Sequence, residues 1–219
     1  MTRRIAAITI GAAPRPDLTD PLRAAVPPDV EVLEYGALDG WTGDPPPPEP
    51  GGYPLTTRAA DGRRIVVDEA WLAPRVAAAV VRAEADGALL CVLLCAGGFD
   101  GIPAEGAVVR PFALAVELLQ GLDVIAPGVL VPDEGQIVPS RDKWTAAGFE
   151  PIVRAGRPDD ISTAFGFETD QTSAWPVLVV LDYVGHPLSV VEAARRASPV
   201  PVVDLGSLAP TVVAATMRR

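Results

Sequence analysis

The feature that most constrains this fold is an unbroken apolar run of strand length, Ala88–Leu94. The run shows no polar–apolar alternation, so it predicts a strand buried on both faces, as in a parallel sheet covered by helices. Other apolar runs predict strands at residues 4–10, 30–35, 124–131, 149–153, 177–182 and 200–203. Helical patterns fall between them, at 17–25, 68–84, 111–120, 141–147, 188–197 and 210–218. Strands that alternate with helices indicate an α/β fold with parallel sheets.

Prolines mark the remaining boundaries. Pro74 is expected in the first turn of its helix, and Pro210 at the start of the last helix, since proline suits the first helical turn. Loop 40–52 holds prolines at 45–48 and 50, which favours an extended polyproline conformation on the surface. An alternative is that this loop is a protein-interaction module. The segment 53–67 is expected to form a short hairpin.

Two pairs of segments indicate a weak internal duplication. IAAITIGAAPR (5–15) resembles VIAPGVLVPDEGQ (124–136), and LLCAGG (93–98) resembles LDYVGH (181–186). We therefore expect two similar α/β/α half-domains. The N-terminal one comprises residues 1–118 plus 203–219 and carries the loop and the hairpin, and the C-terminal one comprises residues 119–202.

Charge and hydropathy exclude several classes of function. The 18 Lys and Arg against 28 Asp and Glu give a net charge of −10, which opposes binding to nucleic acid and to anionic lipid. The uncharged apolar run 87–99 is shorter than the roughly 18 residues a membrane-spanning helix needs. Residues 2–13 imitate a secretory signal peptide, but their apolar part is short and ends in a glycine turn, so a first strand is expected.

Cysteine and histidine are scarce. His186 is the single histidine, so one chain cannot build a site with two histidine ligands, and no metal is expected. Cys91 and Cys95 are the only cysteines. On one strand their Cα atoms would lie about 13 Å apart, too far for a disulfide. Free thiols suit a reducing compartment, and we expect a cytoplasmic protein.

The chemistry is expected at the strand ends, because ligands of open parallel sheets bind beyond the carboxyl ends of the strands. Cys95 is the only soft nucleophile there, and it must be a thiolate to react. Arg15 or Arg58 could supply the positive potential, or could instead bind a substrate carboxylate. Two alternatives stay open: Cys95 as a buried core residue like Cys91, and His186 as an ordinary turn histidine rather than a titrating group in a cleft.

Several segments together resemble the AroM family. They occur in the family's order and spacing over nearly the whole chain: TIGAAPRPD (9–17), EYGALDG (34–40), YPLTTRAADG (53–62), LLCAGGF (93–99), VPDEGQ…KW (131–144) and LDYVGH (181–186). AroM proteins resemble the aspartate/glutamate racemase superfamily. The resemblance implies two α/β half-domains related by a pseudo-twofold axis, with an active site between them.

The resemblance also implies a mechanism without a cofactor. Two cysteines, one from each half, exchange a proton at the α-carbon of a small carboxylate. Cys95 matches the first cysteine, but Tyr183 stands where the family pattern has the second. A phenol, with an ordinary pKa of about 10, can act as an acid but is a poor base at neutral pH.

The expected function is therefore a cysteine-dependent racemase or isomerase, or a one-cysteine decarboxylase or isomerase variant. Cys95 and Tyr183 would be catalytic, and the substrate would be bound by Thr9, Gly11, Arg15, Arg58, Gly97, Gln136 and His186. The alternative is a non-catalytic small-molecule-binding protein with a degenerate cleft. A homodimer is left open, since the sequence does not give the number of subunits.

Overall fold

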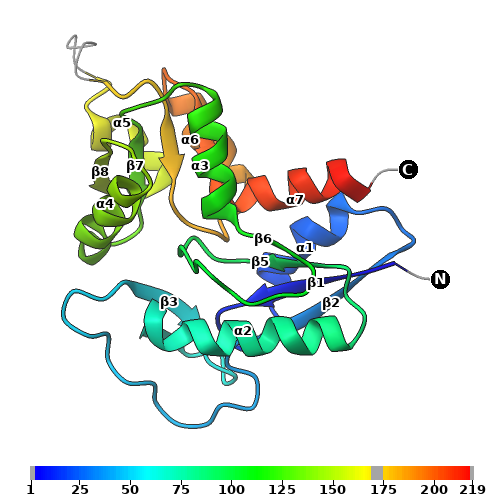
Figure 1. The fold of residues 1–219 in the computed structure, drawn as a ribbon. Helices are drawn as coiled ribbons and strands as arrows, with labels where there is room; N and C mark the ends of the chain where they lie inside the picture. The colour runs from blue at the N-terminus through cyan, green and yellow to red at the C-terminus, as the bar shows by residue number, and fades with distance from the viewer. Residues whose placement is uncertain (1–2, 169–174, 218–219) are drawn as a thin grey trace. The chain divides into compact units, whose positions relative to one another are not determined.

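A computed structural model describes residues 3–168 and 175–217 of the chain. The protein divides into two compact units, which Figure 1 shows. Unit 1 comprises Met1–Ala113 and Ser207–Arg219, and unit 2 comprises Leu114–Gly206. Arg218, the last residue of the expected closing helix, lies outside the described residues.

Unit 1 is built on a parallel sheet of strand order β2-β1-β5-β6, with a separate antiparallel hairpin of β3 and β4 at the predicted place. Its elements are β1 (Arg3–Thr9), α1 (Pro16–Ala25), β2 (Val30–Gly36), β3 (Pro54–Arg58), β4 (Arg64–Asp68), α2 (Glu69–Ala85), β5 (Leu90–Leu93), β6 (Ala107–Val109) and most of α7 (Leu205–Met217). Arg3 donates a hydrogen bond of 3.0 Å to the carbonyl of Met217, which ties the end of α7 to β1.

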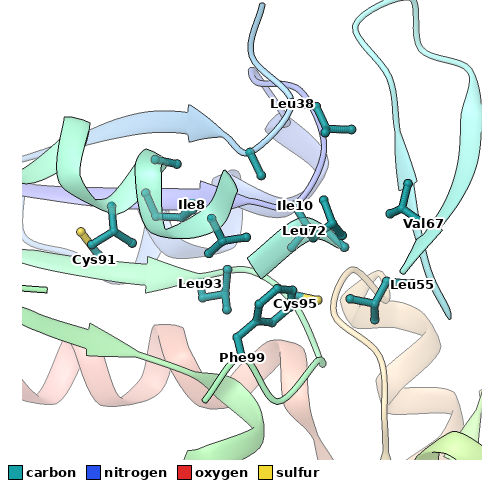
Figure 2. Packing of buried hydrophobic residues seen from close by; sticks show 14 of the residues in the cluster. Ile8, Ile10, Leu38, Leu55, Val67, Leu72, Cys91, Leu93, Cys95 and Phe99 are labelled. Carbon is teal, nitrogen blue, oxygen red and sulfur yellow. The ribbon is translucent and has the colours of Figure 1, made fainter. Parts of the chain in front are cut away.

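The core of unit 1 lies between the sheet and α2. Residues of α2 spaced three or four apart, Leu72, Val76 and Val80, are fully buried in one cluster with Ile8 and Leu93 of the sheet. This spacing puts them on one face of the helix. Leu55 and Val67 of the hairpin join the same cluster, as does the buried Cys91 (Figure 2). The hairpin is therefore packed on the core rather than projecting from it.

Unit 2 repeats this plan with a parallel sheet of strand order β10-β9-β7-β8. Its elements are most of α3 (Pro111–Gly121), then β7 (Gly128–Val131), η1 (Glu134–Gln136), α4 (Ile137–Ala146), β8 (Ile152–Ala155), η2 (Pro158–Asp160), α5 (Ile161–Phe165), β9 (Val179–Leu181), α6 (Leu188–Ala197) and β10 (Val202–Asp204). A second apolar cluster, which includes Leu130, Ile161 and Leu181, fills this unit.

The two sheets have the same topology. Numbered along the chain within each unit, the strands of both sheets lie in the order 2-1-3-4. The residue that follows the third strand also makes the same bond in each unit: the Leu94 amide donates to the Ile8 carbonyl at 2.8 Å, and the Asp182 amide donates to the Leu130 carbonyl at 2.9 Å. The predicted α/β fold of two similar halves is confirmed, and Cys95 and Tyr183 occupy equivalent positions after β5 and β9.

Some predicted boundaries are wrong for identifiable reasons. The strand expected at 124–131 begins only at Gly128, because the preceding residues close α3: Asp123 has φ 54°, and the Val124 amide donates to the Leu119 carbonyl. Pro74 and Pro210 lie inside α2 and α7 rather than in their first turns. A proline in a helix removes one backbone hydrogen bond, which these helices of 17 and 13 residues tolerate here.

Other elements are shifted or were not predicted. The helix expected at 141–147 is α4 and starts earlier, at Ile137, while the strand expected at 149–153 is β8 and starts later, at Ile152. The three-residue strand β6 and the five-residue helix α5 were not predicted. Such short elements carry too few residues to show a periodic pattern.

Candidate functional site

Cys95 lies two residues beyond the end of β5, in a buried setting. Only 5% of the residue is exposed, and it belongs to the apolar cluster of unit 1. Figure 2 shows its sulfur close to Phe99 and Leu55, with Cys91 at the far end of the strand. The predicted placement at a strand end is present, but the sulfur is shielded rather than open to solvent.

The backbone after Cys95 folds back onto its sulfur. The Gly97 amide donates a hydrogen bond of 3.3 Å to Cys95 Sγ. Gly97 also has no room for a side chain, because a Cβ there would lie 2.6 Å from both Glu69 Oε2 and a Phe99 ring carbon. Gly97, which is predicted to bind substrate, is therefore also required sterically in this loop.

The next two amides hold a carboxylate of the chain itself. The Gly98 amide donates to Glu69 Oε2 at 3.1 Å, and the Phe99 amide donates to Glu69 Oε1 at 3.0 Å. Consecutive amides that converge in this way form an anion-binding nest. We call the Gly98 and Phe99 amides the amide nest. It lies directly after the cysteine, and a carboxylate already occupies it.

Arg110 holds the same loop from its carbonyl side. Its Nη1 donates to the carbonyls of Gly98 and Phe99 at 3.4 and 3.1 Å and pairs with the Asp100 carboxylate at 2.6 Å. Phe99 has φ 45°, in the left-handed region that non-glycine residues rarely adopt. The Glu69 carboxylate on the Gly98 and Phe99 amides and the Arg110 guanidinium on their carbonyls thus fix a strained loop beside Cys95.

Arg15 and Arg58 line a separate hollow of about 380 Å³, together with Ala12–Pro14, Asp17, Ala59, Ala60 and Gly62. Arg15 already binds a carboxylate there, since its Nε and Nη2 contact the two oxygens of Asp17 at 2.8 and 2.7 Å. The hydrogen bond from Arg15 lowers the pKa of Asp17, and the charge of Arg58 lowers it further. Cys95 and Gly97 are not among the described residues that line this hollow.

Thr9 and Gly11 have structural partners. Thr9 ends β1, is fully buried, and donates its hydroxyl to the Gly11 carbonyl at 3.4 Å. A Cβ on Gly11 would lie 2.4 Å from Thr57 Oγ1 and 2.5 Å from the Arg58 carbonyl. The Ala12 amide also donates to that carbonyl at 3.1 Å. Gly11 is therefore needed for the hairpin to approach the end of β1.

In unit 2, Tyr183 and His186 lie together after β9. Their ring centroids are 4.8 Å apart, and both residues are half-buried. Burial lowers the pKa of His186 below its ordinary value, and the nearby Asp204 carboxylate partly opposes this. Gln136 lies at the end of η1, after β7, and is half-buried. Tyr183, His186 and Gln136 thus all follow strands of the unit 2 sheet.

Asp182 is a buried acidic residue of unit 2 that was not predicted as a site residue. Its carboxylate is fully buried and accepts hydrogen bonds from Ser140 at 2.7 Å, Lys143 at 2.9 Å and the Trp144 indole at 3.0 Å. All three donors come from α4, so this network anchors the end of β9 next to Tyr183. The available signal was an acidic residue within an apolar run, at 177–184.

Glu69 was also missed. Its position after Asp68 and before an apolar helix is typical of ordinary first-turn acids, and nothing in the sequence indicates its partner 29 residues away. Among the described residues, no group of three or more His, Cys, Asp or Glu side chains is placed to hold a metal ion. The described helices also include none with the length and apolar character of a membrane span.

The comparisons with protein families and with solved structures agree with this α/β fold. The family described as AroM protein matches residues 5–218. A search of curated proteins finds no match.

Solved structures share the fold at low sequence identity. Allantoin racemase from Klebsiella pneumoniae has a TM-score of 0.60 at 17% identity, covering 97% of this chain and 86% of its own. Arylmalonate decarboxylase has a TM-score of 0.62 at 13% identity, covering 99% and 94%. A mutant of the Nocardia farcinica maleate cis-trans isomerase, with a covalently bound succinylcysteine intermediate, has a TM-score of 0.58 at 15% identity, covering 98% and 92%.

Proposed function

The chain belongs to the AroM family, and from this premise we propose that it is a cysteine-dependent enzyme of the racemase or isomerase type that needs no cofactor and acts on a small carboxylate. The fold is shared with racemases, a decarboxylase and an isomerase. The isomerase forms a cysteine adduct of its substrate, as its description states. Cys95 is the residue of this chain that could do comparable chemistry.

One observation carries the proposal. The Cys95 sulfur accepts a hydrogen bond from the Gly97 amide, and the next two amides form the nest that holds the Glu69 carboxylate. A thiolate there would remove the α-proton of a substrate or attack its carbon. Either step pushes an electron pair toward the carboxylate or onto carbon. Fixed amide donors stabilise such developing negative charge at little cost in reorganisation.

The other residues have supporting roles in the proposal. Tyr183 is the acid that returns a proton, because a phenol donates a proton more readily than it accepts one at neutral pH. We assign substrate binding to residues at the strand ends and in the hollow lined by Arg15 and Arg58. These residues are Thr9, Gly11, Arg15, Arg58, Gly97, Gln136 and His186. Arg15 and Arg58 offer the positive charge that a carboxylate needs.

The test is exchange of substrate protons with solvent. Wild-type protein is incubated in D₂O with a panel of small amino and hydroxy acids and dicarboxylates, and NMR follows deuterium incorporation, inversion, isomerisation and loss of CO₂. Cys91→Ala should keep the activity, Cys95→Ala should abolish it, and Tyr183→Phe should slow it. If no acid in the panel reacts with wild type faster than with Cys95→Ala, the enzymatic proposal fails.

A second candidate is a non-catalytic protein that binds small molecules. It is favoured by Tyr183, which replaces the second thiol, and by the shielding of Cys95. This candidate predicts that a carboxylate raises the melting temperature of wild type and Cys95→Ala equally, with no isotope exchange. The enzyme hypothesis predicts exchange that depends on Cys95.

A further inference from the structure

We infer that Glu69 is an internal latch: its carboxylate fills the amide nest beside Cys95 and excludes an external carboxylate until it is displaced. This inference rests on the proposed function, since it identifies the group with which a carboxylate substrate must compete. It concerns contacts within unit 1 only.

The contacts show a carboxylate bound in two-point fashion rather than a helix cap. The cap of α2 is Asp68, whose side chain accepts from the Ala70 amide at 2.8 Å. Glu69 is not needed for that role and instead reaches the Gly98 and Phe99 amides, about 30 residues further along the chain. Each oxygen takes one donor, which is the way these amides would hold any small carboxylate.

Among the described residues, the Glu69 carboxylate forms no ion pair, and its side-chain hydrogen bonds are the two from the nest. Arg110, the nearest guanidinium on this loop, contacts the carbonyls and pairs with Asp100 instead. A half-buried carboxylate held only by amides can be exchanged for another carboxylate without a loss of ion pairs.

Glu69 lies against the same loop residue that contacts Cys95. Its Oε2 is 2.6 Å from where a Gly97 Cβ would be, and the Gly97 amide donates to the Cys95 sulfur. The nest and the sulfur are thus joined through Gly97, so displacement of Glu69 frees amide donors on the loop beside Cys95.

The experiment uses the full chain with Cys91→Ala, so that Cys95 is the single thiol. Glu69→Ala is compared with Glu84→Ala, a matched control in the last turns of the same helix. Glu84 also accepts a backbone amide, that of Gly106, at 2.8 Å, but on a different loop. Glu69→Gln keeps the size of the side chain if Glu69→Ala fails to fold.

The first readout is thermal stability with formate, using chloride at equal ionic strength as the reference. We expect formate to raise the melting temperature of Glu69→Ala by about 2 °C or more, because it refills the nest. A smaller rise is expected for Glu69→Gln, and none for the parent or Glu84→Ala. An equal response in all four proteins overturns the latch.

The second readout compares two alkylating agents of similar size, iodoacetate and iodoacetamide. Both lose iodide to the Cys95 thiolate, but only iodoacetate carries a carboxylate. In Glu69→Ala we expect the rate ratio of iodoacetate to iodoacetamide to rise by about tenfold or more, as hydrogen bonds to a charged group predict. An unchanged ratio, with no formate effect, refutes the inference.

The two readouts separate failure of the latch from failure of the enzyme. If formate stabilises Glu69→Ala but neither reagent modifies Cys95 in any variant, the nest stands and the catalytic role of Cys95 falls. If Cys95 reacts in all variants and Glu69 changes nothing, the latch falls and the proposed function stands.

Discussion

Replacement of Asp182 by alanine should destabilise unit 2 severely. The Asp182 carboxylate is 0% exposed and the Lys143 side chain is 9% exposed, so removal of the acid takes this carboxylate away from a largely enclosed cation. Breaking a buried pair from one side costs about 3–5 kcal/mol. The Ser140 hydroxyl and the Trp144 indole lose their acceptor as well. We expect a loss of about 4 kcal/mol, which is about a thousandfold in the opening equilibrium.

The assay is amide hydrogen exchange on the full chain, read on peptides from α4 and β9, because local opening reports this network more directly than global unfolding. The matched control is Asp159→Ala, which breaks an ion pair whose side chains are 77% and 47% exposed and should leave the local stability nearly unchanged. Adding Lys143→Met to Asp182→Ala should recover part of the loss, because the largely enclosed cation that faced Asp182 is removed as well. If Asp182→Ala and Asp159→Ala are equally mild, the reasoning is refuted.

Three further predictions concern Gly11, Cys91 and His186. Gly11→Ala should cost about 1–3 kcal/mol, since its Cβ would lie 2.5 Å from the Arg58 carbonyl, whereas Gly121→Ala, which meets nothing within 4 Å, should be nearly neutral in thermal melts. In Cys95→Ala, native Cys91 should resist iodoacetamide at about pH 8 until the protein unfolds, because burial raises the pKa of its thiol to about 11; prompt native labelling would contradict this. Burial lowers the pKa of His186 below its ordinary value of 6.5, so near pH 6.5 the unfolded state binds more protons than the folded state. The free energy of unfolding should therefore fall as the pH drops below 6.5. His186→Gln should weaken this pH dependence in denaturant titrations, and an unaltered slope would show that His186 does not contribute.

The parts of the fold that follow from the sequence are those with long, regular patterns. The run at 88–94 shows no alternation, and its residues Leu90–Leu93 form β5, one of the two inner strands of the parallel sheet, whereas Leu89 at its start is 62% exposed. The likeness of LLCAGG to LDYVGH also corresponds to equivalent strand ends after β5 and β9. Both features are local, so a short stretch of sequence is enough to predict them.

The candidate site was only partly predictable, because its key contacts join distant segments. The placement of Cys95 at a strand end followed from the chain, but Glu69 reaches the loop after Cys95 from another element. Asp182 likewise depends on donors from α4, about 40 residues earlier. Sequence spacing gives no information on such long-range pairings.

The most direct test of the central claim is the pH dependence of Cys95 alkylation by iodoacetamide in the Cys91→Ala background, with the unfolded protein as reference. If the Gly97 amide and the surrounding loop stabilise a functional thiolate, native Cys95 will react below about pH 8, where the unfolded reference reacts slowly. If native Cys95 is inert across this range and reacts only on unfolding, it is a structural core residue and the enzymatic account is contradicted.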